Sequence, residues 1–420
     1  METIFAEGTP PGRGGVSVVR ISGPDARRAV ERLAGPLPEP RRTYLRALRD
    51  GDDLIDRAMV IRFDSGASFT GEEIAELQLH GAPVIIARVE AALLSYGLRR
   101  AEAGEFTRRA FINGCLDLAS AEGLADLLAA ETEAQRRLAV RASEGEVGRT
   151  IDGLRQKLIR AGALVEASID FADEEVPEDV PDEVHDLLDS VRQNLTEMLA
   201  KFPATERLRQ GYEVAIIGPP NAGKSTLINA IAKREIALVS NIAGTTRDII
   251  ELRTDLRGLP VTFLDTAGLR DSSDSVEQLG IARARARAQS ADLRIHLSEN
   301  GEIYEGHVEG DLVVRSKADI PIQDSKISVS AATGKGVSEL LDEVYTILRH
   351  RAADSGIVSH KRQAEAIERA LNILLGVSNI LPEFLAESIR QANLELAAMI
   401  GRVGAEDYLD EIFSSFCIGK

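Results

Sequence analysis

The chain has 420 residues, of which 44% are hydrophobic and 28% are charged, and its formal net charge is −17. This composition excludes a mainly disordered chain, and the length predicts two to four domains. The overall field of an acidic chain does not attract nucleic acid, so contact with RNA requires a local basic patch or a basic partner. The two cysteines, Cys115 and Cys417, exclude a disulfide scaffold and a cysteine-built zinc site.

No apolar run reaches the roughly 18 residues of a membrane span. The first residues have neither a basic start nor a long apolar segment, unlike a signal peptide. We therefore expect a cytoplasmic protein that does not bind a membrane.

The first 115 residues mix strand and helix patterns. Runs rich in β-branched residues at 15–21, 58–63 and 74–80 predict strands, and residues 82–96 predict a helix. This pattern indicates an α+β domain over residues 1–115.

From residue 116 the apolar residues recur at helical spacing, and they do so again after residue 348. Between these two helical stretches, the pattern predicts a linker over residues 202–210 and strand–loop–helix units over residues 209–348. The simplest architecture is one helical domain (116–208 plus 349–420) interrupted by an inserted α/β nucleotide-binding domain (209–348). Residues 173–183 hold seven carboxylates and no basic residue. They predict a solvated loop, with a metal site as the alternative.

Residues 218–225 (GPPNAGKS) match the phosphate-loop motif GxxxxGK[ST]. An apolar strand pattern (212–217) precedes them and a helix pattern (226–232) follows, as this motif requires. Backbone N–H groups of such a loop close around phosphates, and the helix N-terminus favours the anion. Lys224 is predicted to reach the β- and γ-phosphates and Ser225 to bind Mg²⁺. The alternative is a glycine turn that merely leads into a helix.

Three further motifs follow in the order that a GTPase requires. Residues 265–268 (DTAG) end a strand pattern, so Asp265 is expected to hold Mg²⁺ through water and Gly268 to meet the γ-phosphate. Residues 244–248 (GTTRD) supply a switch threonine. Residues 316–319 (SKAD) stand at the place of the base-recognition motif [NT]KxD, followed by Ser330 and Ala331. A carboxylate at Asp319 accepts the two guanine donors that adenine lacks.

The base motif departs from its usual form. Ser316 stands where asparagine is usual, and its shorter hydroxyl cannot copy the paired contacts of an amide. We expect guanine selectivity to survive through Asp319, with weaker affinity. The stretch from Gly268 to Ser316 is also short, so we expect one element of the domain to be trimmed.

The residue that positions the attacking water is not fixed by the motifs. Leu269 follows Gly268, where many small GTPases have glutamine. Glu277 is a candidate, with Asp274 and Asp271 as rivals. Spacing alone favours a different role for Glu277, that of a carboxylate stabilised by a helix dipole. The arginines at 283, 285 and 287 fan around a helix and predict a solvated face rather than an arginine finger.

The GTPase motifs and six further segments together resemble the MnmE (TrmE) family of tRNA modification GTPases, nearly from end to end. Besides the GTPase motifs, the resemblance is carried by residues 9–15 (TPPGRGG), 69–72 (FTGE), 76–81 (ELQLHG), 104–107 (GEFT), 116–119 (LDLA) and 416–420 (FCIGK). It implies a multidomain α+β fold. An N-terminal tetrahydrofolate-binding-like domain dimerises, and a P-loop G domain is inserted into a helical domain.

The resemblance also implies how the G domain works. K⁺ takes the place of an arginine finger, held by the Asn221 side chain and by backbone oxygens of Ser240, Ile242 and Thr245. Mg²⁺ is held by Ser225 and Thr246. The resemblance implies that Glu277 is the catalytic glutamate and that Lys224 is a second catalytic residue. The full set implied for GTP binding is Asn221, Ala222, Gly223, Lys224, Ser225, Thr226, Ser240, Ile242, Thr245, Thr246, Asp265, Thr266, Ala267, Gly268, Ser316, Lys317, Asp319, Ser330 and Ala331.

For the reaction, the resemblance implies that a homodimer binds GTP or GDP, joins the flavin-dependent protein MnmG in a heterotetramer and modifies carbon 5 of the tRNA wobble uridine. The added group is aminomethyl or carboxymethylaminomethyl. Its one-carbon unit comes from 5-formyl- or methylene-tetrahydrofolate, bound by Arg20, Glu76 and Lys420. Cys115 stands where the family usually has lysine, and Cys417 is implied near the folate as a catalytic candidate.

Two other functions stay open at this point. One is a ribosome-assembly GTPase, although the basic RNA-binding domain usual beside such a G domain is absent from the sequence. The other is a folate-dependent aminomethyl transferase that acquired a regulatory G domain. Folate titration and analysis of tRNA nucleosides distinguish the three functions.

Overall fold

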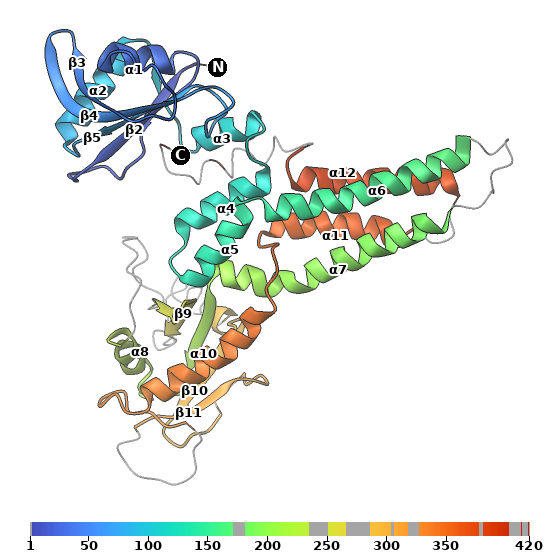
Figure 1. Cartoon of the computed structure of the whole chain (residues 1–420). Helices are drawn as coiled ribbons and strands as arrows, with labels where there is room; N and C mark the ends of the chain where they lie inside the picture. Colours follow the sequence, from blue (N-terminus) through green and yellow to red (C-terminus); the bar gives the residue numbers. More distant parts are fainter. Residues whose placement is uncertain are drawn as a thin grey trace, which may run out of the picture. The chain divides into compact units, whose positions relative to one another are not determined.

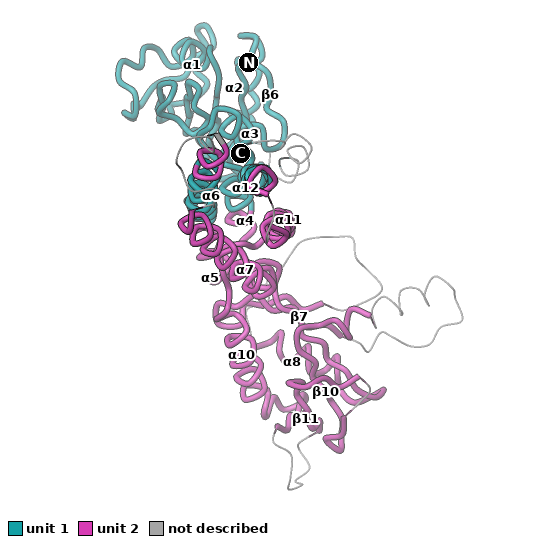
Figure 2. Tube along the Cα trace, turned by 90° about the vertical axis from the view of Figure 1, so that its right-hand side faces the viewer, with its two compact units in different colours: residues 1–125, 142–163, 386–420 teal, residues 126–141, 164–385 magenta. Residues whose placement is uncertain are grey.

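The chain divides into two units, each formed by separate stretches of sequence (Figure 2). Unit 1 contains residues 1–125, 142–163 and 386–420, and unit 2 contains residues 126–141 and 164–385. The structure, a computed structural model, describes residues 2–170, 181–234, 251–265, 286–303, 306–317, 327–377 and 381–402, together with Phe413 and Gly419. None of the helices in these described ranges is long and apolar enough to cross a membrane.

Unit 1 contains a six-stranded sheet (Figure 1). Its strands, in sheet order, are β3 (Tyr44–Asp50), β4 (Asp53–Phe63), β5 (Ile74–Leu79), β2 (Ser17–Ser22), β1 (Ile4–Glu7) and β6 (Arg99–Arg100). All neighbours are antiparallel except β1 and β6. The predicted strands 15–21, 58–63 and 74–80 are confirmed as β2, β4 and β5.

Alternation along the strands places the core of unit 1 on one sheet face. Val19 and Ile21 of β2 and Leu77 of β5 are fully buried there, against helices α1 (Ala26–Ala34) and α2 (Pro83–Ser95). Helix α2 confirms the helix expected over residues 82–96. On the other face, Arg20 and Glu76 occupy the intervening positions and stay partly exposed.

The remaining helices of unit 1 continue from the sheet. They are α3 (Glu105–Ile112), most of α4 (Leu118–Ala129), the first two-thirds of α6 (Glu146–Asp170) and most of α12 (Pro382–Met399). Arg155 of α6 donates from Nε to Asn393 Oδ1 of α12 at 3.1 Å. Buried Ile151, Leu154 and Leu158 follow one face of α6, which confirms the helical spacing expected after residue 116.

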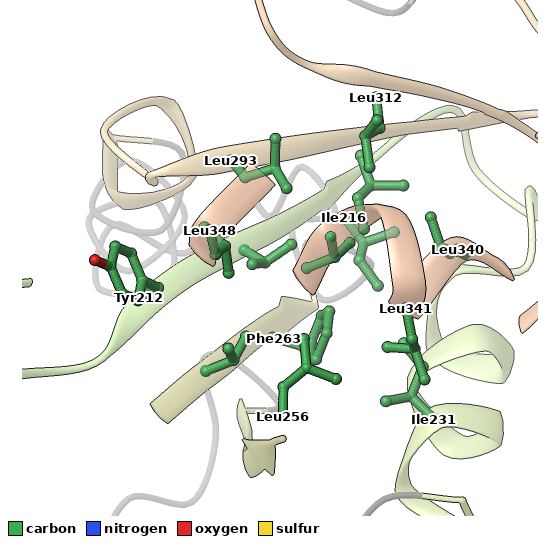
Figure 3. Close-up of a cluster of buried hydrophobic side chains, with 14 of the residues drawn as sticks. Tyr212, Ile216, Ile231, Leu256, Phe263, Leu293, Leu312, Leu340, Leu341 and Leu348 are labelled. Carbon is green, nitrogen blue, oxygen red and sulfur yellow. The ribbon is translucent and has the colours of Figure 1, made fainter. Parts of the chain in front are cut away.

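Unit 2 contains the α/β domain. Its five-stranded sheet has the order β11 (Leu312–Arg315), β10 (Leu293–Ser298), β7 (Tyr212–Ile217), β9 (Leu259–Asp265) and β8 (Glu251–Leu256). Only β8 is antiparallel to its neighbour. Apolar side chains of the strands pack against helices α8 (Lys224–Ala232) and α10 (Val337–Ala353), and Figure 3 shows this core, with Ile216, Phe263 and Leu341 among its residues.

Helices α7 (Asp182–Gln210), α11 (Lys361–Leu375) and most of α5 (Glu133–Ser143) complete unit 2. The linker expected over residues 202–210 is wrong, because α7 continues through Pro203 to the last residue before the Gly211 turn. Leu208 of this segment packs in the core of the α/β domain together with Tyr212. Tertiary packing therefore overrides the helix-breaking tendency of the proline.

The connection from β10 to β11 has no helix in its described part. Only residues 299–311 join them, and their described part, 299–303 and 306–311, contains no helix. Parallel neighbours usually need a helical crossover of a dozen residues or more. The stretch from Gly268 to Ser316 is described only in part, so the trimmed element stays a prediction.

Replacement by alanine is expected to change the stability of unit 1 in opposite directions at two of its helical glycines. A Cβ on Gly123 of α4 would lie 2.5 Å from Ser143 N and 2.6 Å from Ala142 Cβ, whereas a Cβ on Gly153 of α6 would meet nothing within 4 Å. We expect Gly123→Ala to destabilise unit 1 by about 1–3 kcal/mol, the usual cost of overpacking. Gly153→Ala should stabilise it by up to about 1 kcal/mol through helix propensity. Thermal unfolding of both variants checks this, and equal shifts would contradict the close packing at Gly123.

Candidate functional site

The phosphate loop connects β7 to α8 at the carboxyl edge of the parallel strands. Its first glycine is required by packing, because a Cβ on Gly218 would lie 2.0 Å from the backbone oxygen of Leu297 on β10. Two later residues adopt left-handed backbone angles, Asn221 (φ 64°) and Gly223 (φ 96°), and Gly223 is the N-cap of α8. These turns direct the loop back into the first turn of a helix, where phosphates bind.

Lys224 is the best-defined charged group of this loop. Its side chain is buried, with 6% of the residue exposed, and Nζ donates to the backbone oxygens of Gly218 at 2.9 Å and Pro219 at 3.0 Å. Burial lowers the pKa of Lys224, and the negative charge of Asp265 opposes that shift. The ammonium therefore sits inside the loop, held by neutral carbonyls that an anionic ligand can replace.

Asp265 and Ser225 have the chemistry of a magnesium site. Asp265 is buried as the last residue of β9 and is paired in register with Ile216 near the end of β7. Ser225 is half-buried in the first turn of α8. A carboxylate and a hydroxyl at neighbouring strand and helix ends are oxygen ligands of the kind that Mg²⁺ prefers. The residues present therefore fit the ion implied by the motifs.

The base-recognition residues lie at the same edge of the sheet, after the parallel strand β11. The N–H of Ser316 donates to Ser298 O at 2.8 Å, and Ser316 is buried. Its hydroxyl oxygen has no hydrogen-bond partner among the described residues. Lys317 adopts a left-handed backbone angle (φ 55°) and pairs with Glu299. This hydroxyl is thus a buried polar atom next to the expected guanine position.

The loop that should read the guanine oxygen is also formed. Val329 N donates to Arg315 O at 2.8 Å, which attaches residues 327–329 to the end of β11. Ser330 is buried, and its N–H donates to Lys335 O at 2.9 Å, while Ala331 is half-buried. Phosphate and base motifs from four parts of the sequence therefore lie along one sheet edge, the usual ligand position in open α/β sheets.

A second site lies in unit 1. Arg20 of β2 and Glu76 of β5 are cross-strand partners, and Arg20 Nε lies 2.8 Å from Glu76 Oε1. Both side chains line an open pocket of about 390 Å³ whose walls include Phe63, Phe69 and Ile74. Its size lies at the lower end of the range for small-molecule sites, and it combines apolar walls with a few charged groups.

The C-terminal end of the chain returns to this region of unit 1. Arg20 Nη1 donates to Gly419 O at 3.3 Å, and a Cβ on Gly419 would lie 2.4 Å from Glu7 O. Phe413 is buried beside Phe111 and Leu118. Gly419 therefore needs to be glycine, both for its close approach to β1 and for its positive φ of 100°.

Comparison with known proteins now decides the family. Residues 3–115 match the family described as GTP-binding protein TrmE N-terminus, and residues 118–417 match the MnmE helical domain. A curated tRNA modification GTPase MnmE from Paracoccus denitrificans is 70% identical over 420 residues, with 100% of both chains covered. The chain belongs to the MnmE family of tRNA modification GTPases. A second MnmE, from Dinoroseobacter shibae, is 52% identical over 100% of both chains.

Similarity among solved structures is weaker. The G domain of the T. maritima FeoB iron transporter matches with 23% identity and a TM-score of 0.25, over 32% of this chain and 98% of that chain. A TM-score this low supports no conclusion about this chain. The MnmE assignment rests on the full-length relatives and the two domain families.

The MnmE pattern can be followed only on part of the expected residues. The phosphate loop, Asp265, the Ser316 and Ser330 loops, Arg20 and Glu76 lie among the described residues, and their functional roles stay predictions. Glu277, Cys417 and Lys420 lie outside the described residues, as do Ser240, Ile242, Thr245, Thr246, Thr266, Ala267, Gly268 and Asp319. Residues 173–180 of the acidic stretch lie outside the described residues as well. The roles of all these residues stay predictions.

Cys115, which replaces the usual MnmE lysine, lies exposed just after α3. A Cβ on Gly71 would lie 2.9 Å from its Sγ, so the thiol lies against the loop between β4 and β5.

A residue that sequence reasoning missed is Arg41, which lines the Arg20 pocket. Arg41 belongs to no motif. Only the fold, which places the segment before β3 beside the β4–β5 loop, brings it to the pocket.

The buried hydroxyl of Ser316 generates a test of base recognition. Ser316→Asn restores the amide usual at this position, and we expect it to tighten GTP binding about three- to tenfold by adding a net hydrogen bond or two. Ser316→Ala should change GTP affinity less than Ser316→Asn does, because a single hydroxyl can offer the guanine at most part of the paired contacts of an amide. Titration with GTP and ATP measures both variants. Weaker GTP binding by Ser316→Asn would contradict the alignment of this loop with the base motif.

Proposed function

We propose that this protein hydrolyses GTP as part of the modification of the tRNA wobble uridine. The observation that carries the proposal is the buried Lys224 ammonium, held inside a strand–loop–helix phosphate loop and next to the carboxylate of Asp265. The family membership of the whole chain supports the same activity. We propose that Asp319 provides guanine specificity and that Ser316 and Ser330 also contribute to base recognition.

The chain's own groups divide the work of hydrolysis. Lys224 exchanges its two carbonyl acceptors for β- and γ-phosphate oxygens and stabilises the negative charge that develops on them. The N–H groups at the start of α8 orient the phosphates. Ser225, Thr246 and Asp265 would hold Mg²⁺, which neutralises phosphate charge when it is bound. Glu277 would orient the attacking water, since Leu269 has no polar group for that task.

Asn221 is proposed as the side-chain ligand of K⁺. It is exposed at the tip of the phosphate loop, and its backbone is turned by a positive φ. Its amide oxygen is a neutral ligand suited to a monovalent cation, and Ser240, Ile242 and Thr245 would add backbone oxygens. A bound K⁺ supplies the positive charge that an arginine finger provides in other GTPases.

The finer reaction is likewise a proposal. A homodimer, joined with the flavin-dependent partner MnmG, would transfer a one-carbon unit from a tetrahydrofolate derivative in the cytoplasm. The Arg20–Glu76 pocket supports a folate site, because it pairs charged groups with the aromatic walls Phe63 and Phe69. Lys420 would add a cation, and Cys417 would lie close to the folate. The docking of Gly419 against Arg20 supports this placement of the tail.

Potassium dependence tests the role of Asn221. We expect GTP hydrolysis to be about tenfold or more faster in K⁺ than in Na⁺ at equal ionic strength, because the proposed K⁺ would supply positive charge to the transition state. Asn221→Ala should remove the difference while GTP binding remains. Steady-state rates in the two salts measure this. Equal rates for the wild-type protein would rule out the K⁺ site.

A test of the whole function uses cells that lack this protein. Mass analysis of tRNA should show unmodified carbon 5 at the wobble uridine, and the wild-type chain should restore the modification. Glu277→Ala should lower kcat for GTP about 10²–10⁴-fold, as loss of a water-orienting group does, and fail to restore it. Normal wobble uridines in the deletion strain, together with a ribosome-assembly defect, would favour the assembly GTPase instead.

A further inference from the structure

The pocket that contains Arg20 and Glu76 has a charge imbalance. Arg20 and Glu76 form an ion pair with N and O 2.8 Å apart, with 24% and 20% of their side chains exposed. The pair therefore contributes no net charge to the pocket. Arg41 is a third charged residue lining the pocket. No carboxylate of the described residues lies within ion-pair distance of it, so the pocket keeps a net positive charge.

Arg41 is held in place before any ligand arrives. Its backbone adopts φ 58°, an uncommon angle for a residue other than glycine, and its N–H donates to Arg62 O on β4 at 2.7 Å. The side chain of Arg62 is buried and donates to Leu37 O at 2.6 Å and to Pro38 O at 2.9 Å. The segment before β3 is thus fixed to β4 by three hydrogen bonds.

The guanidinium of Arg41 is also fixed on its other side. Nη2 donates to Ala67 O at 2.7 Å, in the loop between β4 and β5 that forms one wall of the pocket. That loop is closed by its own hydrogen bonds, from Gly66 N to Gly71 O at 2.9 Å and from Ser65 Oγ to Gly71 O at 3.0 Å. Arg41 bridges two constrained segments and keeps further N–H groups available, so little side-chain entropy is lost when it binds an anion.

We propose that Arg41 binds a carboxylate of the folate glutamate tail at the rim of this pocket. The inference rests on the proposed folate function and adds a residue to it. The pterin ring occupies the part of the pocket walled by Phe63 and Ile74, and the tail runs outward past Arg41.

The test compares two ligands that differ only in the tail. 5-Formyltetrahydrofolate carries the glutamate, whereas 5-formyltetrahydropteroylamide keeps the pterin ring and the p-aminobenzoyl group and lacks the glutamate. Arg41→Gln keeps an N–H donor for Ala67 O and removes the charge. We expect it to weaken 5-formyltetrahydrofolate binding about three- to tenfold and to reduce the salt dependence of that binding, while affinity for the pteroylamide without glutamate stays unchanged.

Arg42→Gln is the matched control, because Arg42 is the exposed neighbour, paired with Glu39 and not part of the pocket lining. Isothermal titration with the full chain measures all affinities. Equal weakening of both ligands by Arg41→Gln would overturn the proposal and make Arg41 a loop clamp. An Arg41→Gln affinity equal to that of Arg42→Gln would also overturn it.

One further variant distinguishes failure of the proposed folate site from failure of the proposed role of Arg41. Arg20→Ala should abolish binding of both ligands, because it removes a charged group from the centre of the pocket. If Arg20→Ala abolishes binding of both ligands and Arg41→Gln has no effect, the folate site is supported and the proposed role of Arg41 is wrong. If Arg20→Ala changes neither ligand's affinity, the folate site itself is wrong, and the inference falls with it.

Discussion

The nucleotide site depends on one close approach between two backbone segments. Where β7 ends, Gly218 lies so close to Leu297 O of β10 that no side chain fits between them. This contact lets the chain turn directly from the sheet into the phosphate loop. The loop then folds back over its own carbonyls, which receive the Lys224 ammonium, and enters α8 at its positive end. A larger residue at position 218 would displace Lys224 from the edge where Asp265 and Ser316 also lie.

The sequence was informative wherever a short segment determines its own geometry. The GxxxxGKS run predicted a strand, a loop and a helix, because glycine positions, a helix start and a buried strand are local properties. Its position relative to Asp265 and Ser316 followed from the parallel order of the strands. The error at residues 202–210 had the opposite cause. Pro203 disfavours a helix locally. The helix nevertheless continues, because Leu208 is buried together with Tyr212 in a contact that forms only in the folded core.

The pocket of unit 1 was predictable only in part for the same reason. Family motifs pointed to Arg20 and Glu76, and the antiparallel pairing of β2 with β5 sets them side by side. Arg41 has no such signal. It reaches the pocket through a loop that is fixed by the buried side chain of Arg62, a charged residue that a sequence pattern assigns to the surface. The described end of the tail, Gly419, likewise reaches β1 through tertiary contacts alone.

Charge explains how an acidic chain can bind anionic ligands. A net charge of −17 repels anionic ligands at long range, but salt screens such repulsion beyond about 8 Å at physiological ionic strength. Inside that distance only the local groups matter, and burial strengthens their effect because the local dielectric constant is lower. Lys224 is buried among carbonyls, and Arg41 stands beside an already neutralised pair. Each site therefore presents a cation at short range, so its affinity for an anion is set by geometry within the site and not by the charge of the whole protein.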